Sequence, residues 1–266
     1  MSREQAVYKG VNVQRTPDLN QLRCLCHAPI LPYTSPSLLL LLLSLLCLVS
    51  TPGCRKKRPA APPAPRPVYV AMGASDTQSV GASRQEMGYV YQILRRLRAE
   101  TGANWKLENV GKSGALVTDL AERQLPLAVR FKPKVVTLWT GGNDVRGDIS
   151  LQTFEENLER IFQTLTTKTD AVIAAANLPR MSEQPFAAAM SAAEKRQMQT
   201  RADAINAITT RLAQKYGVHV VDLGAGDLMY NPANMAADGL HLNDAGHTGL
   251  AERFWAVLSE TVQAKK

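Results

Sequence analysis

From Val68 onward, short apolar stretches alternate with longer amphipathic ones, and this alternation constrains the fold more than any other feature. Stretches typical of strands occupy residues 68–72, 104–110, 134–140, 171–176 and 218–223. The longer stretches carry apolar side chains at helical spacing, most clearly over residues 87–97, 153–165, 192–216 and 244–262. Strands separated by helices favour right-handed βαβ units and a parallel sheet covered by helices on both faces. We therefore predict one α/β domain with about five parallel strands over residues 68–266.

The helix predicted after the third strand carries its own start signal. Thr153 and Glu156 have the spacing of a capping box, in which each side chain accepts a hydrogen bond from the other residue's backbone amide. Leu158, Ile161 and Leu165 then continue the apolar stripe. Thr153 is therefore predicted to be the N-cap of this helix.

The positive charge of the chain lies almost entirely in its first 67 residues. The formal net charge is +8, with nine basic and two acidic residues before Val68 and 22 basic and 21 acidic residues from there on. A nucleic-acid-binding domain keeps its basic residues on the folded part. The distribution therefore argues against nucleic acid as a partner and assigns the charge to a leader and a tether.

The cysteines are distributed in the same way. All four, Cys24, Cys26, Cys47 and Cys54, precede the predicted domain. This excludes a disulfide framework and a cysteine metal site within that domain. Its histidines and carboxylates also lack the spacing of metal ligands, so we predict no metal and no cofactor.

Residues 1–53 are predicted to be a leader that contains a secretory signal. Leu38–Val49 is an apolar run of 12 residues, which fits the roughly 7–15 of a signal peptide and falls short of the roughly 20 of a membrane span. The segment Ser50–Cys54 resembles a bacterial lipoprotein lipobox, although Thr51 stands where leucine is usual. That resemblance implies that Cys54 is lipidated. An uncleaved membrane anchor is the alternative, favoured by the basic residues directly after Cys54.

Residues 54–67 are predicted to be a basic, proline-rich tether. Five of the nine residues from Pro59 to Pro67 are proline, which favours an extended spacer of about 3.1 Å per residue. Such a spacer holds a domain away from a surface. With the leader, it predicts export to a bacterial cell envelope and a membrane-tethered domain outside the cytoplasm.

Four polar, glycine-containing clusters follow predicted strands or precede the last helix. They are Gly73–Asp76, Asn109–Ala115, Gly141–Asp144 and Asp238–His241. Each cluster alone is typical of an ordinary turn. Because the carboxyl ends of parallel strands meet at one edge of a sheet, where α/β proteins bind their ligands, we expect the clusters to lie together.

Together, the clusters supply the groups of a serine hydrolase. Asp238 and His241, three residues apart, allow the carboxylate to bind one ring nitrogen and leave the other as a general base. That base can take the proton of Ser75, whose hydroxyl is otherwise a poor nucleophile. Donors for a developing oxyanion are the Ser75 amide, the Gly114 amide and the Asn143 side chain. The set predicts nucleophilic attack on a carbonyl carbon.

In this order and spacing, the clusters resemble the four blocks of the SGNH/GDSL hydrolase superfamily of esterases and lipases, over residues 68–247. The resemblance implies a flavodoxin-like three-layer α/β/α sandwich. It implies that Ser75 is the nucleophile, that His241 is the base and that Asp238 orients this base. It also implies that Gly114 and Asn143 join the Ser75 amide in the oxyanion hole.

The first two clusters leave two questions open. The family usually has Gly-Asp-Ser in its first block, whereas here Ala74 precedes the serine and Asp76 follows it. In the second block, Asn109 or Gly111 could share the role of Gly114.

The sequence therefore predicts an exported serine esterase that hydrolyses acyl or acetyl esters of carbohydrates, lipids or small alcohols through an acyl-enzyme on Ser75. The loop 178–192 is a candidate border of the acyl pocket, and a solvated surface loop is the alternative. His219 and His247 are predicted to be structural. The alternative function is a catalytically silent envelope-binding lipoprotein with the same fold, which Ala74 favours and the intact serine, aspartate and histidine set disfavours.

Overall fold

The computed structural model describes residues 65–147 and 149–264, with side chains up to residue 260. The predicted signal segment, Cys54 and the tether up to residue 64 lie outside these ranges. No helix within them is both long and apolar enough to cross a bilayer. The last tether residues lie against the domain, where Lys106 N donates to the Pro67 carbonyl over 2.9 Å.

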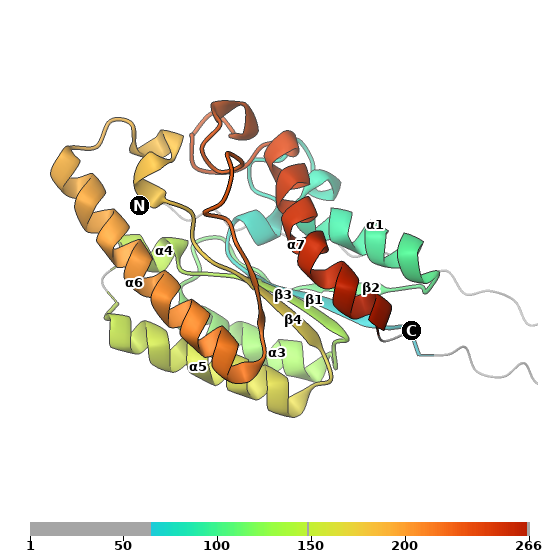
Figure 1. Ribbon diagram of the computed structural model, residues 1–266. Helices are drawn as coiled ribbons and strands as arrows, with labels where there is room; N and C mark the ends of the chain where they lie inside the picture. Colours follow the sequence, from blue (N-terminus) through green and yellow to red (C-terminus); the bar gives the residue numbers. More distant parts are fainter. Residues whose placement is uncertain (1–64, 148, 265–266) are drawn as a thin grey trace, which may run out of the picture. The chain divides into compact units, whose positions relative to one another are not determined.

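Five parallel strands form one sheet, as predicted (Figure 1). The strands are β1 (Val68–Gly73), β2 (Lys106–Asn109), β3 (Val135–Trp139), β4 (Val172–Ala176) and β5 (His219–Val221). Their order is β2-β1-β3-β4-β5, and every neighbouring pair is parallel. This is the flavodoxin-like order, whose ligand sites lie at the carboxyl ends of the strands beside β1.

Helices cover both faces of the sheet and confirm the three-layer sandwich (Figure 1). On one face lie α1 (Tyr89–Thr101) and α7 (Asp244–Ala264), which pack together. On the other lie α3 (Leu125–Arg130), α5 (Leu151–Lys168) and α6 (Ala192–Tyr216). Single 3-10 turns cover Asp76–Gln78 (η1), Gln85–Met87 (η2), Met181–Glu183 (η4), Pro185–Ala187 (η5) and Pro232–Asn234 (η6).

Strand β1 shows how its side chains divide between two cores. Tyr69 and Ala71 belong to the core beneath α1 and α7, whereas Val70 and Met72 belong to the core beneath α3, α5 and α6. All four are fully buried. Successive strand residues point to opposite faces, so a central strand covered on both faces needs a continuous apolar run. The run that begins at Val68 meets this need and places the following serine beyond the sheet edge.

The predicted start of α5 is wrong by three residues. The N-cap is Ser150, whose hydroxyl accepts from the Thr153 amide over 2.9 Å. Thr153 is therefore the third residue of the helix and not its cap. Ser150 offers the same acceptor one turn earlier, and a start at Leu151 lets this side chain pack on the core.

Between β2 and β3 the chain forms helical turns that we did not predict from the sequence. They are α2 (Val117–Asp119), a π-helical turn η3 (Leu120–Gln124) and α3. A π-helical turn shifts the positions that follow it away from the 3.6-residue period. Pro126, in the first turn of α3, also reads in sequence as a helix breaker. The regular apolar spacing by which the longer helices were predicted is therefore absent here.

Candidate active site

Ser75 lies just beyond β1, at a bend whose shape depends on Gly73. The φ angle of Gly73 is +151°, and a Cβ there would lie 2.3 Å from Thr77 Oγ1 and 2.6 Å from the Trp139 carbonyl oxygen. Only glycine tolerates such an approach. The buried side chain of Gln124 holds this glycine from the other side, since its Nε2 donates to the Gly73 carbonyl and its Oε1 accepts from the Gly73 amide, both over 2.9 Å.

Ser75 begins the single 3-10 turn η1. Its carbonyl accepts from the amides of Gln78 and Val80 over 3.0 and 3.1 Å, which folds the loop back on itself. Asn109 Nδ2 donates to the Thr77 carbonyl over 2.6 Å and ties the turn to the end of β2. The Ser75 amide enters no hydrogen bond with another described residue, so it remains a donor for a ligand.

Asp238 and His241 form the predicted pair at the opposite side of the site. His241 Nδ1 lies 2.6 Å from Asp238 Oδ2, and Asp238 Oδ1 accepts from the amides of Leu240 and His241, each over 2.9 Å. Burial acts to raise the pKa of Asp238, but the hydrogen bonds from the His241 side chain and from these two amides lower it to about 2. The carboxylate is therefore ionised at neutral pH and orients the ring.

Asn143 lies in the first turn of α4 (Gly142–Arg146), directly after β3. Its Nδ2 donates to the Ala115 carbonyl over 3.0 Å, and its Oδ1 accepts from the Arg146 guanidinium over 2.9 Å. Arg146 thereby sets which end of the carboxamide faces Ala115. The amide nitrogen has two hydrogens, and one of them remains after the bond to Ala115.

Gly114 adopts a φ of +77° and is exposed, while its neighbour Ala115 lines the cavity beside Ser75. Asn109 and Gly111 are both engaged with the serine turn. The Gly111 amide donates to Asn109 Oδ1 over 3.1 Å, and a Cβ on Gly111 would lie 2.5 Å from Thr77 Cγ2. The second cluster therefore supports the turn through Asn109 and Gly111 and reaches the cavity through Ala115.

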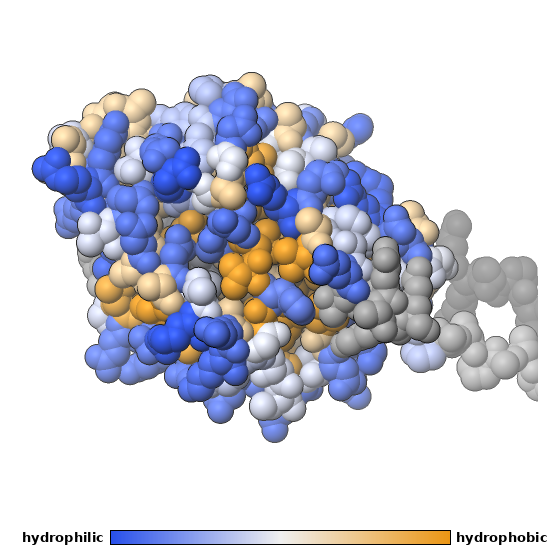
Figure 2. All heavy atoms as spheres, in the orientation of Figure 1, coloured by the Kyte–Doolittle hydropathy of each residue, from blue (hydrophilic) through white to orange (hydrophobic). Residues whose placement is uncertain are grey.

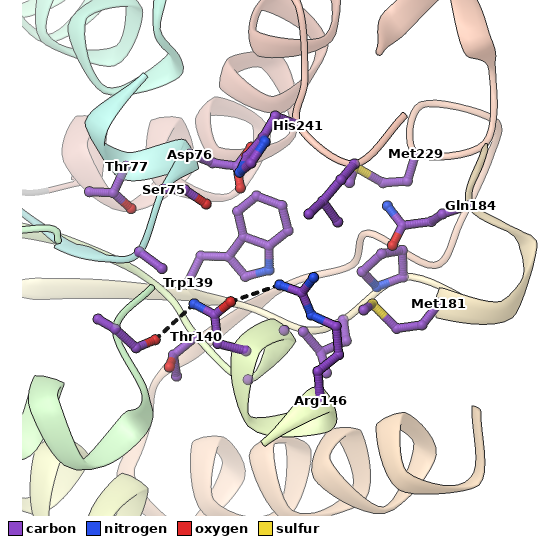
Figure 3. A pocket seen from close by; sticks show the side chains of 18 residues that line it. Ser75, Asp76, Thr77, Trp139, Thr140, Arg146, Met181, Gln184, Met229 and His241 are labelled. Carbon is purple, nitrogen blue, oxygen red and sulfur yellow. Dashed lines mark hydrogen bonds between the residues drawn. The ribbon is translucent and has the colours of Figure 1, made fainter. Parts of the chain in front are cut away.

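Ser75, Asn143 and His241 line one cavity of about 70 Å³ at the carboxyl edge of the sheet. Figure 3 shows Ser75 and His241 in the wall of this cavity. Asp238 is bonded to the ring of His241 and does not itself line the cavity. The Ser75 hydroxyl and the ring are not hydrogen-bonded to each other in the described part of the chain. Such contacts often become tight only when substrate is bound. Apolar side chains complete the wall, namely Ala74, Trp139, Leu178, Pro179, Met181, Met229 and Leu240.

The first half of the predicted pocket loop contributes to this wall. Leu178, Pro179, Met181 and Gln184 line the cavity, whereas Phe186 does not. The Phe186 amide instead donates to the Gly239 carbonyl over 3.0 Å. The loop is therefore bonded directly to the turn between Asp238 and His241.

His247 is structural, as predicted. It is fully buried in α7, its ring lies 7° from parallel to the ring of Tyr89, and its Nε2 lies 3.2 Å from the Val80 carbonyl oxygen. Burial lowers the pKa of His247, which favours the neutral ring. His219 is exposed on β5 and does not line the cavity. The described residues contain no group of three or more His, Cys, Asp or Glu side chains that could hold a metal ion.

Asp76, to which we assigned no role from the sequence, also lines the cavity (Figure 3). Its Oδ1 is buried and has no hydrogen-bond partner among the described residues. Burial raises the pKa of this carboxyl group, while His247, His241 and the Leu242 amide act in the opposite direction. The residue after the serine is thus a half-buried acid, with one fully buried carboxylate oxygen, that interacts with two histidines.

Three further residues of the site were not predicted from the sequence. Arg146 orients Asn143, and the two are three residues apart on one helix, a spacing that could have indicated their contact. Gln124 and Trp139 carried no such signal, because their contacts join segments that are distant along the chain.

A profile described as the GDSL-like Lipase/Acylhydrolase family matches residues 71–248. The match spans more than half of the chain, and the chain therefore belongs to this family of hydrolases. No curated protein matches the sequence.

Solved structures of two esterases and of an α/β hydrolase share the fold at low sequence identity. An acetyl xylan esterase is 24% identical with a TM-score of 0.56, and the alignment covers 71% of this chain and 98% of that one. An α/β hydrolase from the metagenome of Lake Arreo, Spain, is 23% identical with a TM-score of 0.57 and coverages of 73% and 95%. The psychrotrophic esterase EstA from Pseudoalteromonas sp. is 16% identical with a TM-score of 0.58 and coverages of 74% and 98%. At these identities the likeness establishes the fold.

Proposed function

We propose that the protein is a serine esterase that forms an acyl-enzyme on Ser75. The observation that carries this proposal is the 2.6 Å contact between Asp238 and His241, whose ring shares one cavity with Ser75 and Asn143. A ring held in this way presents its second nitrogen as a base. Membership of the GDSL-like lipase/acylhydrolase family supports the same reaction class.

In the first step, Ser75 Oγ bonds to the ester carbonyl carbon while its proton moves to His241 Nε2. Asp238 stabilises the imidazolium that forms. The carbonyl oxygen becomes an oxyanion, which accepts from the Ser75 amide and the Asn143 Nδ2, each donor contributing about 2.7–4 kcal/mol in comparable sites. Gly114 does not line the cavity, so the role expected of its amide stays a prediction. The bond to the alcohol oxygen then breaks, and the alcohol leaves with the proton from His241.

In the second step, His241 takes a proton from a water molecule whose oxygen attacks the acyl carbon. The bond between this carbon and Ser75 Oγ breaks, and the serine recovers its proton from His241. The products are a carboxylic acid and the resting enzyme, so protons and bonds balance over the cycle.

We infer a short acyl group from the size of the cavity. Its volume of about 70 Å³ is far below the roughly 300 Å³ at which pockets begin to take drug-sized ligands. Trp139, Leu178 and Met181 give the wall apolar surface against which a short acyl group can pack. The similarity in fold to an acetyl xylan esterase is consistent with an acetyl-sized group.

A panel of nitrophenyl esters, from acetate to decanoate, tests both inferences on the detergent-solubilised full chain. We expect the wild type to act fastest on the shortest esters, and Ser75→Ala and His241→Ala to lose about 10⁴-fold or more in kcat. Wild-type rates no higher than those of either variant would refute the esterase.

The second candidate, a silent envelope-binding lipoprotein, is favoured by Ala74 in place of the usual aspartate. Labelling by a fluorophosphonate probe separates the two candidates, because only an activated serine reacts. Covalent labelling of the wild type that is absent in Ser75→Ala supports the esterase. An unlabelled wild type that still binds envelope fragments supports the lipoprotein.

We also propose that the domain is exported and attached to the membrane through a lipid on Cys54. The support is the apolar run Leu38–Val49 followed by small residues before Cys54, a pattern typical of secretory signals. Cys54→Ala should then move the protein from the membrane fraction to the soluble fraction. Cys47→Ala is the matched control and should stay with the membrane. Retention of both variants would favour an uncleaved anchor.

A further inference from the structure

One carboxylate oxygen of Asp76 is a buried acceptor that no described residue satisfies. Its Oδ1 is shielded from solvent and has no hydrogen-bond partner among the described residues. Leaving such an atom without a partner destabilises the protein, and more so when the group is charged. Native structures retain few of them, and a catalytic role is one of the reasons for which they are retained.

The loop that carries Asp76 is held firmly against the segment that carries His241. A Cβ on Gly81 would lie 2.9 Å from His241 Cβ. Ser83 donates to both carboxylate oxygens of Asp244, through its amide over 2.8 Å and its hydroxyl over 2.6 Å. The position of the acid beside the base is therefore built into the packing of loop 75–83 on residues 241–247.

Three titratable side chains interact with the Asp76 carboxyl group, namely His241, His247 and Tyr89. His247 is an unsuitable cation, because its Nε2 lies against the Val80 carbonyl and its Nδ1 accepts from the Tyr89 amide over 3.4 Å. Burial raises the pKa of Tyr89, so its hydroxyl stays neutral. His241 alone gains a positive charge during the proposed reaction, with Asp238 on the other side of its ring.

We propose that Asp76 is a positioning residue whose ionised carboxylate attracts the positive charge that His241 acquires when it takes the proton of Ser75. The unpartnered oxygen is unfavourable in the resting enzyme and gains its counter-charge only as the reaction proceeds. An interaction that is stronger in the transition state than in the ground state raises the rate. This role rests on the proposed esterase reaction and adds a second acid to it.

The test is Asp76→Asn, which keeps the shape of the side chain and removes its charge. We expect kcat/KM at neutral pH to fall about tenfold. In the profile of kcat/KM against pH, the acidic limb should move about one pH unit lower, because one pKa unit corresponds to a tenfold change in proton affinity. The direction follows from the charge: without a neighbouring anion, His241 holds its proton less tightly and is neutral at lower pH. The rate of fluorophosphonate labelling against pH gives a second measurement of the same limb.

Asp244→Asn is the matched control. This substitution weakens the contact between Ser83 and residue 244 that holds the loop 75–83, but it leaves the charge at position 76. The acidic limb of its pH profile should therefore stay at the wild-type pH. An active wild type with an Asp76→Asn limb that does not move would refute the role of Asp76. An inactive wild type that the probe does not label would instead refute the esterase itself, and the two failures are thus distinct.

Discussion

Two aspartates contact or face His241, and they differ in exposure and in hydrogen bonding. Asp238 is half exposed, with 51% of its side chain accessible, and its carboxylate accepts three hydrogen bonds. Asp76 is held in the cavity wall with one carboxylate oxygen buried and unpartnered. Hydrogen bonding holds the pKa of Asp238 at about 2, whereas burial raises the pKa of Asp76.

The difference separates two ways in which an acid can support a base. Asp238 is satisfied before the reaction begins, so it fixes the ring and its tautomer in the resting enzyme. Asp76 is poorly satisfied at rest, so in the proposed reaction its contribution grows only as charge develops. Substitutions that remove one of the two charges at a time should therefore have different effects on rate and on stability.

The largest expected effect is that of Asp238→Asn on kcat. The carboxamide can donate to His241 Nδ1 and stabilise the tautomer whose Nε2 carries a proton and cannot act as a base. We expect a loss of about 10²–10⁴-fold, measured on nitrophenyl acetate. Asp227→Asn, another exposed acid on the same segment, should keep the wild-type rate. A loss below tenfold for Asp238→Asn would remove the distinction between the two acids.

A smaller effect is expected when Asp76→Asn is added to Asp238→Asn. Both acids act on one imidazolium, and groups that act as a unit are not additive. The second substitution should therefore lower kcat/KM by less in this background than the tenfold expected in the wild type. Losses that multiply would show that the two acids act independently. The comparison needs kcat/KM for all four members of the double-mutant cycle, namely the wild type, the two single variants and the double variant.

Thermal stability should respond in opposite directions. If Asp76 is ionised at rest, as proposed, Asp76→Asn replaces a half-buried charge by a neutral group and should raise Tm by about 2–4 °C, the shift for roughly 1 kcal/mol in a domain of this size. Asp238→Asn loses the hydrogen bonds that the carboxylate accepts from the His241 ring and from two backbone amides, and it should lower Tm slightly. Calorimetry of the three proteins at one pH measures both shifts. A lower Tm for Asp76→Asn would show that its carboxylate is already satisfied in the resting state.

The smallest effect is the acid dependence of stability. The pKa of Asp238 is about 2 in the folded protein, below its ordinary value of 3.8. Its stabilising contribution is therefore present above pH 4 and is lost as the pH falls toward 2. Because the side chain is half exposed, solvent screens the interaction and the effect is small. Urea midpoints at pH 6 and pH 3 should differ less for Asp238→Asn than for the wild type.

Most of the fold could be predicted because its elements follow regular periods. The central strand β1 is a continuous apolar run, and α6 carries its own N-cap at Ser191 and ends at Gly217. The helical turns after β2 were missed because a π-helical turn breaks the period over Leu120–Gln124. The four later strands were predicted one to three residues too long, since the residues at either edge of a strand pattern belong as readily to the adjoining turn, whereas β1 extends one residue beyond its prediction.

The candidate site could be predicted where a strand or a motif positions the residue. Ser75 and Asn143 follow neighbouring strands of the sheet, so topology brings them to one edge. The contact between Gln124 and Gly73 joins residues 51 apart, and no local pattern encodes it. The same holds for Asp76, whose burial depends on the packing of the loop after it against residues 241–247.

The hydrogen bond from the Phe186 amide to the Gly239 carbonyl joins the loop whose first half lines the cavity to the turn that carries the base. In the proposed enzyme, an acyl group too large for the cavity would push this wall outward and displace His241 through the same bond. Poor substrates would then be bound while His241 is misaligned for proton transfer. Chain-length selectivity would accordingly act on kcat as well as on KM.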